Sequence, residues 1–486
     1  MKKYFIKGIK NPFIWLFFVA GFTVLIQNYI GILYNYDSNA YLYFANNIVY
    51  NLDFLRDPRY APLYSFSLSF LQFSGLNTVQ SILVYSLGSY YLILLGFYLI
   101  SKNSIFSIIG FFTIFSNLTT ATQFRFVWTE LGYSVLLITA VLGLYKYKIS
   151  YNTKYKFLFL FSIALLPVQR YIGGYVSLYL GLIYFFLYKK NFVNRGVELF
   201  LTTIPLVIVI LWNIYLSGYI SGPRVKAHLG LIENTKLVLK VLYFNFSPEW
   251  LIYLFIVFIL FILIWKKKKS LFLFFIFITP FIQVCSQIQS SSTYRINKIN
   301  TRYFIVLTPL IIFLLIIFLK EIFKKNKSHY KYYLLALFIG LNSSNLFLLT
   351  NRYDYNLGGQ NRNLNTKIES FAKVREFLSS IPRNTNVGIY VRNTKFLQAE
   401  FILTSRIIPQ NHNQGYSVSK NYKTGNSSYI PQNNNGHIYT PIYMDSIIKP
   451  NYLLIHKSYL KNDWQKNFNN YKISNLGSFF GLTKFD

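Results

Sequence analysis

Residues 12–32 read Pro-Phe-Ile-Trp-Leu-Phe-Phe-Val-Ala-Gly-Phe-Thr-Val-Leu-Ile-Gln-Asn-Tyr-Ile-Gly-Ile, and Tyr-Asp-Ser-Asn-Ala-Tyr follows at 36–41. The first stretch is apolar, uncharged and about as long as the roughly 20 residues that cross a bilayer as a helix. Asp37 therefore falls just outside the first membrane span. The chain has only 15 acidic residues, so a carboxylate held at the membrane surface indicates chemistry with a lipid-linked substrate.

Similar apolar runs recur over the first 350 residues. Hydrophobic residues make up 53% of the chain and charged residues only 13%, whereas soluble domains carry about 25% charged residues. The sequence predicts a polytopic membrane protein with about 11 transmembrane helices. The lysine-rich N-terminus resembles a signal peptide but has no small-residue cleavage site, so we expect an uncleaved first span. The expected spans lie at 12–32, 78–100, 104–122, 129–146, 157–170, 172–188, 197–216, 249–265, 270–288, 303–319 and 332–350. A shorter apolar segment at 62–76 is expected to form a helix that lies at the interface.

The formal net charge of +34 would suggest nucleic acid in a soluble protein. Here most lysines lie in alternate loops, which is the pattern of cytoplasmic loops in membrane proteins. Nucleic acid is therefore excluded as a partner, and we expect a cytoplasmic N-terminus. The sparser exceptions are Lys226, Lys236, Lys240 and Lys298 in outer loops. The lysine-rich loops contain Lys102, Lys146, Lys148, Lys154, Lys156, Lys189, Lys190, Lys266 to Lys269, Lys320, Lys324, Lys325, Lys327 and Lys331.

The composition becomes polar and rich in asparagine after residue 351. Helical periodicity at 365–380 and 393–405, with strand-like runs at 387–391 and 452–456, predicts a small α/β domain. The segment 409–436 is expected to be a loop. The sequence thus predicts an all-α membrane domain at 1–350, with its first outer loop at 33–77, and an extracytoplasmic α/β domain at 351–486.

Cofactor signals are few. Cys285 is the only cysteine and the five histidines are scattered, so no metal-ligand spacing is present. A divalent metal stays open. The chain has no glycine-rich phosphate loop, which argues against a nucleotide cofactor.

Asp37 has two interpretations. As an ordinary feature, Asp37 or Ser38 caps the N-terminus of a helix. As a functional one, Tyr36, Tyr41 and the neighbouring aromatic residues form an amphipathic interfacial helix that holds the carboxylate near lipid headgroups. The two roles are compatible, because Ser38 can cap while Asp37 reacts.

Basic and aromatic residues recur at the other outer turns. Arg59 and Tyr60 lie between Pro58 and Pro62, either in a plain turn or in a rigid lip that presents an arginine fork to phosphate. Arg125 and Glu130 form either a surface ion pair or part of a site. The remaining candidates are Arg170, Arg302 and Tyr303. Arg170 either snorkels to the interface or is functional, because charge at membrane depth is costly; Arg302 and Tyr303 either anchor a span at the interface or bind substrate.

One carboxylate with several arginines suits transfer of a sugar from a polyprenyl phosphate. The lipid phosphate leaves as a stable anion and needs fixed positive charge, while the attacking hydroxyl needs a base. Ordinary glycoside hydrolysis would instead require a pair of carboxylates across the bond.

These motifs resemble the GT-C membrane glycosyltransferases, in particular the bacterial branch related to protein O-mannosyltransferases and the lipid A aminoarabinose transferase. The resemblance is carried by the order of Tyr-Asp-Ser-Asn-Ala-Tyr, Arg-Tyr-Ala-Pro-Leu-Tyr (59–64), Arg125 with Thr129-Glu130, Gln169-Arg170-Tyr171 and Thr301-Arg302-Tyr303. It implies that Asp37 is the catalytic or acceptor-orienting acid. Asp53 or Asp57 could match a second acid found in this loop of the family, and some members of the family use a divalent metal.

The resulting expectation is a multi-pass glycosyltransferase of a bacterial plasma membrane. It would use Asp37 and Glu130 in catalysis and bind substrate through Arg59, Tyr60, Arg125, Arg170, Arg302 and Tyr303. Its partners would be a polyprenyl-phosphate-linked sugar, membrane lipids, and a glycan, lipid or protein acceptor. The alternatives are a transporter of lipid-linked glycans, which would be expected to show buried polar groups and broken spans, and a glycan polymerase or ligase.

The positions of the lysines generate a prediction about topology. Reporter fusions at Lys268 and at Asn393 should report opposite sides of the membrane, with Lys268 in the cytoplasm. Signals from the same side would overturn the predicted orientation and remove Asp37 from the outer face.

Overall fold

The computed structural model describes most of the helical part of the chain and short segments of the C-terminal part. The described residues are 11–33, 36–52, 54, 60–186, 192–220, 229–245, 248–268, 270–293, 301–322, 373, 376–377, 380–382, 386–390, 417–418, 429–430, 438–442, 451–456, 468–476 and 479–485.

The helical part is built from long apolar helices with two shorter ones between the first two spans. The helices are α2 (Pro12–Ile30), α3 (Tyr36–Asn51), α4 (Leu63–Phe73), α5 (Thr78–Ser101), α6 (Ser104–Ser116), α7 (Leu118–Gln123), α8 (Glu130–Ser150), α9 (Thr153–Gln169), α10 (Gly173–Phe186), α11 (Phe192–Ser217), α12 (Leu231–Asn245), α13 (Pro248–Lys268), α14 (Leu271–Thr293), the 3₁₀ helix η1 (Thr301–Phe304) and α15 (Leu307–Ile322).

The predicted spans coincide with these helices, apart from two differences. The run 104–122 is divided into α6 and α7 at Asn117, whose amide oxygen accepts from the backbone of Thr120. The segment with Lys236 and Lys240, expected to be a loop, contains α12, which the sequence did not predict. The span expected at 332–350 lies outside the described residues.

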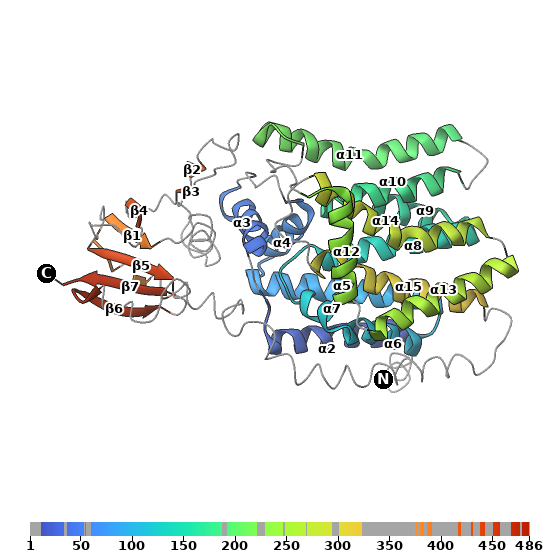
Figure 1. The fold of residues 1–486 in the computed structure, drawn as a ribbon, viewed down its shortest axis with the longest axis horizontal. Coiled ribbons are helices and arrows are strands. Elements are labelled where there is room, and N and C mark those ends of the chain that lie inside the picture. Colours follow the sequence, from blue (N-terminus) through green and yellow to red (C-terminus); the bar gives the residue numbers. More distant parts are fainter. Residues whose placement is uncertain are drawn as a thin grey trace, which may run out of the picture.

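Length and composition identify four of the described helices as able to cross a membrane, in α2, α5, α11 and α14. Shorter apolar stretches lie in α6, α10 and α13. Most of the helices lie side by side with their axes roughly aligned, whereas α12 crosses them (Figure 1). The all-α polytopic membrane domain is thus confirmed as the architecture of this part.

Asparagines define where several helices begin. The side chains of Asn11, Asn77, Asn103 and Asn152 accept backbone N–H bonds in the first turns of α2, α5, α6 and α9. Such caps satisfy donors that a helix cannot pair internally. Helices α5 and α6, and α8 and α9, are joined by short turns that contain these asparagines, and the two helices of each pair pack against each other.

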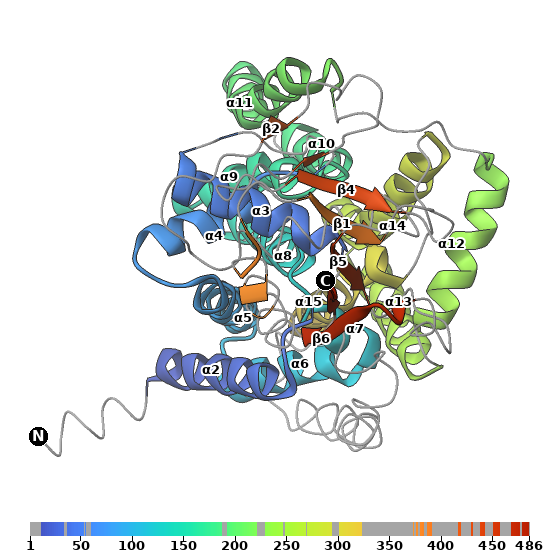
Figure 2. The same cartoon turned by 90° about the vertical axis from the view of Figure 1, so that its left-hand side faces the viewer.

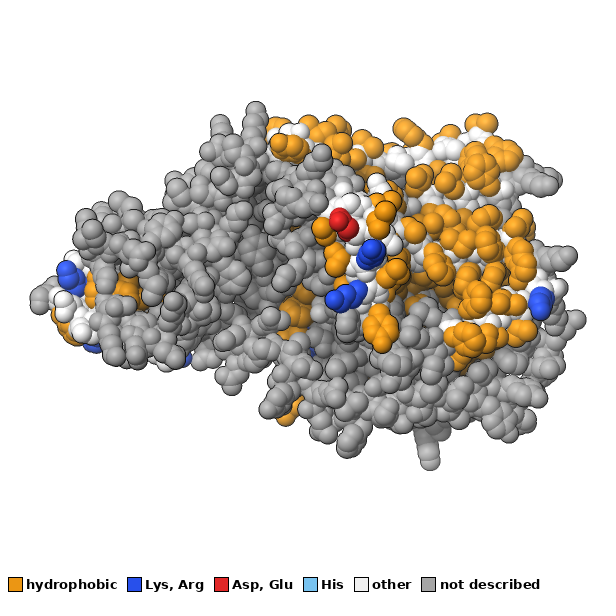
Figure 3. All heavy atoms as spheres, viewed as in Figure 1, with side chains coloured by type: hydrophobic (Ala, Val, Ile, Leu, Met, Phe, Trp, Pro, Cys, Tyr) orange, Lys and Arg blue, Asp and Glu red, His pale blue; other side chains and the backbone are white. Residues whose placement is uncertain are grey.

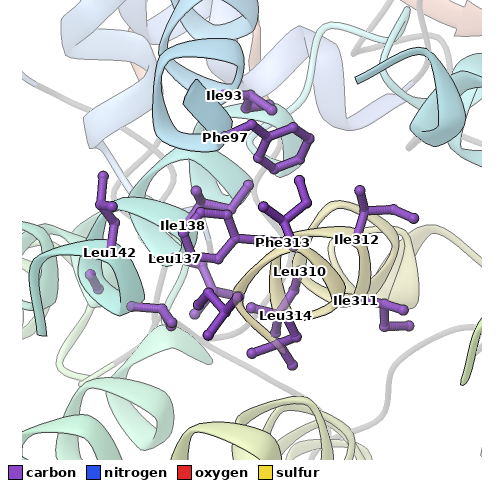
Figure 4. Close-up of a cluster of buried hydrophobic side chains, with 14 of the residues drawn as sticks. Ile93, Phe97, Leu137, Ile138, Leu142, Leu310, Ile311, Ile312, Phe313 and Leu314 are labelled. Carbon is purple, nitrogen blue, oxygen red and sulfur yellow. The ribbon is translucent and has the colours of Figure 1, made fainter. Parts of the chain in front are cut away.

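The core of the membrane domain is centred on α15. Its residues from Leu307 to Leu319 are buried, and they pack against α5 and α8 (Figure 4). Phe313 stacks on Phe97 with 5.9 Å between the ring centroids.

The outer surface is also apolar. On α11, for example, Val193 exposes 79% and Phe200 69% of their surfaces. Hydrophobic side chains cover much of the helical surface in Figure 3, while charged ones gather over α12. An apolar exterior over helices whose backbones are internally bonded is what a lipid environment requires.

The C-terminal part contains a five-stranded mixed sheet in the order β4-β1-β5-β7-β6. Strands β1 (Asn386–Tyr390) and β5 (Tyr452–His456) match the predicted strands. Strands β4 (Ile438–Ile442), β6 (Tyr471–Leu476) and β7 (Phe479–Lys484) were not predicted, and the expected loop 409–436 contains the short antiparallel pair β2 (Ser417–Val418) and β3 (Tyr429–Ile430). Of the helix expected at 365–380, residues 373 and 376–377 are described as helical; the helix at 393–405 lies outside the described residues.

The sheet lies at one end of the helices, on the side where α3 and α4 lie (Figures 1 and 2). Phe377, Ile381, Leu454 and Leu476 belong to the same buried hydrophobic cluster as residues of α3 and α4 such as Tyr41. The turn between α8 and α9 and the C-terminal end of α13, which are next to lysines, lie at the opposite end (Figure 1). These lysines are therefore separated in the fold from Glu130 and Arg170, at the start of α8 and just after the end of α9.

A glycine where α8 and α9 are in close contact provides a test of this packing. A Cβ atom on Gly143 would lie 2.7 Å from the backbone nitrogen of Phe159 and 2.9 Å from the carbonyl oxygen of Tyr155. We expect Gly143→Ala to lower the free energy of unfolding by about 1–3 kcal/mol, as overpacking does. Thermal unfolding in detergent would measure it. Gly88→Ala is the control, because its Cβ would meet nothing within 4 Å; equal stability of the two variants would contradict this packing.

Candidate functional site

A buried ion pair lies at the end of the helices that is nearer the sheet. Nη1 of Arg170 is 3.3 Å from Oε1 of Glu130, an ion pair without a hydrogen bond at this nitrogen. The two side chains expose 11% and 1% of their surfaces. The guanidinium also lies over two aromatic rings, 5.9 Å from the centroid of Tyr133 and 5.7 Å from that of Tyr303. The cation is thus held by one carboxylate and two ring faces.

Local sequence explains why these groups meet. Glu130 is the first residue of α8, where a negative charge is favoured by the helix dipole. Arg170 follows the last residue of α9 with an extended backbone, and a tight turn then leads into α10, in which Gly173 N–H bonds to the carbonyl of Arg170 at 2.7 Å. A Cβ on Gly173 would lie 2.5 Å from the carbonyl oxygen of Leu166, so this turn requires glycine.

Gln169 fixes the other side of the pair. Its amide nitrogen donates to the carbonyl of Thr129 at 3.0 Å and to the hydroxyl of Tyr85 at 3.3 Å. Gly132 leaves room for this contact, because a Cβ there would lie 1.8 Å from the Tyr85 hydroxyl. The ends of α8 and α9 are therefore tied together by neutral hydrogen bonds as well as by charge.

Tyrosine rings connect this site to α3. Tyr64 contacts Tyr85 with 4.9 Å between centroids, and Tyr41 of α3 contacts both Tyr64 and Tyr60, at 5.5 and 5.4 Å. The carbonyl of Tyr60 accepts a hydrogen bond from Tyr171, next to Arg170, at 3.2 Å. Burial, and to a smaller extent the neighbouring Tyr85, raises the pKa of Tyr64 well above its ordinary value, so this ring stays neutral.

For Asp37 and Arg302 the structure describes the backbone alone. Asp37 is in the first turn of α3, one turn before Tyr41; because the helix begins at Tyr36, Asp37 and Ser38 lie within the helix instead of capping it. Nothing is described of the side chains of Asp37 and Arg302, although Arg302 lies in η1 next to Tyr303. Arg59 lies outside the described residues. The structure brings together Glu130, Arg170, Tyr303 and, through the tyrosine contacts, Tyr60.

The environment of Arg125 differs from that of Arg170, because Arg125 contacts the backbone. Its Nε and Nη2 atoms both donate to the carbonyl of Gly31, at 3.1 and 2.8 Å. Backbone bonds between Leu33 and the segment 125–127 extend this contact, at 3.0 and 3.1 Å. Arg125 therefore holds the end of α2, from which the chain passes to α3, against the segment that leads to Glu130.

A narrow cavity adjoins Arg125, with room for about one water molecule. It lies among α2, α5 and the segment before α8. Its lining includes Gln27, Tyr64, Tyr85, Arg125 and Trp128. Polar groups of this kind could hold a small polar group between the candidate arginine and the tyrosine contacts.

One polar feature was missed by sequence reasoning. Thr279, Gln283, Gln287 and Ser291 recur every fourth residue on α14, expose no more than 4% of their surfaces and form a buried polar face. The Oε1 atom of Gln283 accepts a hydrogen bond from the hydroxyl of Tyr133 at 2.7 Å. The spacing of four was visible in the sequence, but it could not show that this face points inward. Polar groups of this kind are also what a transporter would be expected to contain.

The arrangement can bind an anion and orient an uncharged polar ligand. Arg170 offers a guanidinium whose position is fixed on several sides, and the surrounding tyrosines offer ring faces and hydroxyl groups. Among the residues that the structure describes, no group of three or more histidine, cysteine or acidic side chains could hold a metal ion.

We compared the sequence and the fold with those of known proteins. No family model and no curated protein matches the chain. The structure is similar to that of ArnT from Cupriavidus metallidurans bound to undecaprenyl phosphate, with a TM-score of 0.54, 8% identity, and coverage of 96% of this chain and 97% of that chain. For ArnT in the apo state the values are 0.52, 9%, 96% and 97%. A weaker similarity is to an oligosaccharyltransferase from Archaeoglobus fulgidus in complex with Zn and sulfate, with a TM-score of 0.46, 12% identity, and coverage of 80% and 61%.

ArnT is a lipid A aminoarabinose transferase of the GT-C type. The match extends over nearly the full length of both chains. This chain therefore has the ArnT-like GT-C fold, and the resemblance that the sequence motifs indicated is confirmed at the level of the fold.

The buried pair generates a stability prediction. Removing one partner of a buried ion pair leaves a charge without compensation and costs about 3–5 kcal/mol. We expect Glu130→Gln and Arg170→Gln each to lower the free energy of unfolding by about 3 kcal/mol. The double variant should lose much less than the sum, because its members are coupled. Thermal unfolding of the three variants in detergent would measure this; additive losses would show that the two side chains act independently.

Proposed function

We propose that this protein is an integral membrane glycosyltransferase that moves a sugar from a polyprenyl-phosphate donor to a lipid, glycan or protein acceptor. The supporting observation is the fixed guanidinium of Arg170 at the end of a GT-C fold, connected by tyrosine contacts to the helix that carries Asp37. A neighbour of that fold, ArnT, binds undecaprenyl phosphate, which supports a lipid phosphate as the leaving group.

In the proposed reaction the acceptor oxygen attacks the anomeric carbon of the sugar. The bond from that carbon to the phosphate oxygen breaks, and its electron pair stays with the lipid phosphate. The acceptor proton passes to a carboxylate. Negative charge therefore develops on the phosphate oxygens, where a preorganised cation lowers the barrier most.

Arg170 is proposed to receive that charge. Its guanidinium has a planar fork that matches phosphate oxygens, and the contacts with Glu130, Tyr133 and Tyr303 limit its motion. Glu130 then contributes to catalysis by orienting Arg170. Arg59, Arg302 and Arg125 are proposed to assist in holding the phosphate, and Tyr60 and Tyr303 to contact the substrate.

Asp37 is proposed to act as the base, or to orient the acceptor. Its helix packs on α4 through bonds from Ser65 and Ser69 to the carbonyls of Tyr41 and Ala45, at 2.9 and 3.2 Å. These contacts fix the backbone of α3 relative to the tyrosines. A positioned carboxylate can then accept the proton of a hydroxyl group.

The reaction is proposed to take place on the outer face of a bacterial plasma membrane, with the N-terminus in the cytoplasm and the C-terminal domain outside. A transporter of lipid-linked glycans is the second candidate, and the buried polar face of α14 is the observation that favours it. A glycan polymerase or ligase would use the same transfer chemistry on a different acceptor.

Asp37→Asn tests the role of the acid. The amide retains the size of the side chain but cannot accept a proton, so transfer should fall by at least about 100-fold, the lower limit for loss of a general base. The assay uses purified protein with a polyprenyl-phosphate sugar and candidate acceptors, and follows release of free lipid phosphate. Glu233→Gln is the control, because it changes an acid in the first turn of a different helix, α12, and should leave transfer unchanged.

Two outcomes would contradict the proposal. Near-normal transfer by a well-folded Asp37→Asn protein would remove Asp37 from the reaction. Movement of the lipid across vesicles without cleavage of the sugar–phosphate bond, for every acceptor tried, would favour the transporter.

A further inference from the structure

Arg170 is held by its neighbours, and one of these neighbours, Tyr133, is itself held by a hydrogen bond to α14. The ring of Tyr133 lies under the guanidinium, with 5.9 Å between Cζ and the ring centroid. The hydroxyl of the same ring, at its far end, donates to Oε1 of Gln283 at 2.7 Å. Tyr133 and Gln283 both expose 0% of their surfaces. The contacts thus run from Arg170 through the ring to α14.

The position of Tyr133 makes this contact important for the whole site. It lies three residues after Glu130 on α8 and therefore faces the same side of that helix. Arg170 thus contacts both Glu130 and Tyr133 of α8. A tyrosine ring can turn about its side-chain bonds, and a hydrogen bond at its far end restricts that motion.

Stability alone does not explain why a glutamine occupies position 283. Its Nε2 atom is buried and has no hydrogen-bond partner among the residues that the structure describes. One turn away, the hydroxyl of Thr279 is in the same situation. A buried donor without a partner destabilises a fold, whereas an apolar residue of similar shape would not. A glutamine at this position therefore calls for a reason other than packing.

We propose that Gln283 is a positioning residue for Arg170. By accepting a hydrogen bond from the hydroxyl of Tyr133, it fixes the ring that the guanidinium contacts. Gln283 does not touch the substrate in this proposal. It acts through Tyr133, and it aims the arginine at the place where the lipid phosphate leaves. The catalytic part of this inference rests on the proposed function, while the mechanical part concerns Arg170 itself and holds for any function of the site.

The alternative is an ordinary hydrogen bond between two membrane helices that only stabilises the fold. The two interpretations differ in what happens when both partners are removed. If the bond is only structural, Tyr133→Phe with Gln283→Leu leaves two apolar groups, and nothing at Arg170 should change. If the bond positions the ring, the double variant should fold normally but release Arg170.

The first measurement does not depend on enzyme activity. Phenylglyoxal modifies accessible arginines, and peptide mass spectrometry gives the rate at Arg170. In the purified full chain we expect Gln283→Leu and the double variant to speed labelling of Arg170 by about 3- to 10-fold, the range expected for loss of one hydrogen bond. Gln287→Leu is the matched control. It removes a buried glutamine one turn away whose amide donates to Ser291 at 3.3 Å, and it should leave the labelling rate unchanged.

The second measurement is kinetic. Misdirecting Arg170 should lower kcat by about 10- to 100-fold, as a small misplacement of a reacting group does. The KM for the lipid donor should change little, because the loss falls on the transition state. Gln283→Glu keeps an acceptor oxygen at the same reach and should restore most of the rate. In the Gln283→Leu background, Arg170→Lys should cost less than it does in the wild-type protein, since coupled residues are not additive.

The outcomes separate the two proposals. Unchanged labelling of Arg170 in a folded Gln283→Leu protein, with thermal unfolding like that of the control, would overturn the positioning role. Altered labelling in a protein whose wild type transfers no sugar would support the positioning role and overturn the proposed transferase. Equal loss of activity in Gln283→Leu and Gln287→Leu would assign both glutamines to packing alone.

Discussion

The ion pair between Glu130 and Arg170 is the constraint on which the rest of this site depends. Two charges that expose 1% and 11% of their surfaces must be compensated, because desolvation makes an isolated buried charge very costly. Compensation here requires the start of α8, the end of α9 and η1 to meet at one point. The glycines at 132 and 173 allow the chain to approach closely enough, since neighbouring atoms already occupy the space that a Cβ atom would need. The geometry of the helix ends therefore follows from the need to keep one guanidinium paired.

The membrane domain satisfies two different demands with the same kind of side chain. Apolar residues of α15 fill the interior, while apolar residues of α11 face outward with exposures as high as 85% for Tyr215. In water the second group would be destabilising, whereas in lipid it is required. Stability can then come from close packing. Glu130, Arg170 and the polar face of α14 are polar groups within this packing, and they are connected to one another through Tyr133.

Sequence reasoning predicted the helices well because length and hydrophobicity identify membrane spans directly. Helix α12 was missed because Lys236 and Lys240 favoured a loop, although a crossing helix at the edge of the domain can carry lysines. Strands β6 and β7 were missed because Lys472, Ser474, Asn475 and Gly481 interrupt their apolar residues. In the sheet, β7 pairs with β5 and β6 pairs with β7. For the site, the outward position of Glu130 and Arg170 was predicted from the order of spans. Their pairing was not, because helix rotation decides which side chains meet. Arg125 was expected to bind substrate, and its additional bonds to the backbone carbonyl of Gly31 are a contact that no residue pattern indicates.

In the transferase proposed above, the polar face of α14 would combine rigidity with a reactive centre. A guanidinium that must stabilise charge only in the transition state has to be placed before the reaction begins, because reorganisation at that moment would add to the barrier. In an apolar interior few groups can supply directional contacts. The hydroxyl of Tyr133 and the amide of Gln283 are therefore suited to this purpose, even though the amide leaves one donor without a partner in the described part of the chain. Such local costs are common where function, and not stability, determines which residue is kept. The same reasoning applies to the ring contacts among Tyr41, Tyr64 and Tyr85. They connect the helix that carries Asp37 to the site of Arg170 without placing another charge in the membrane.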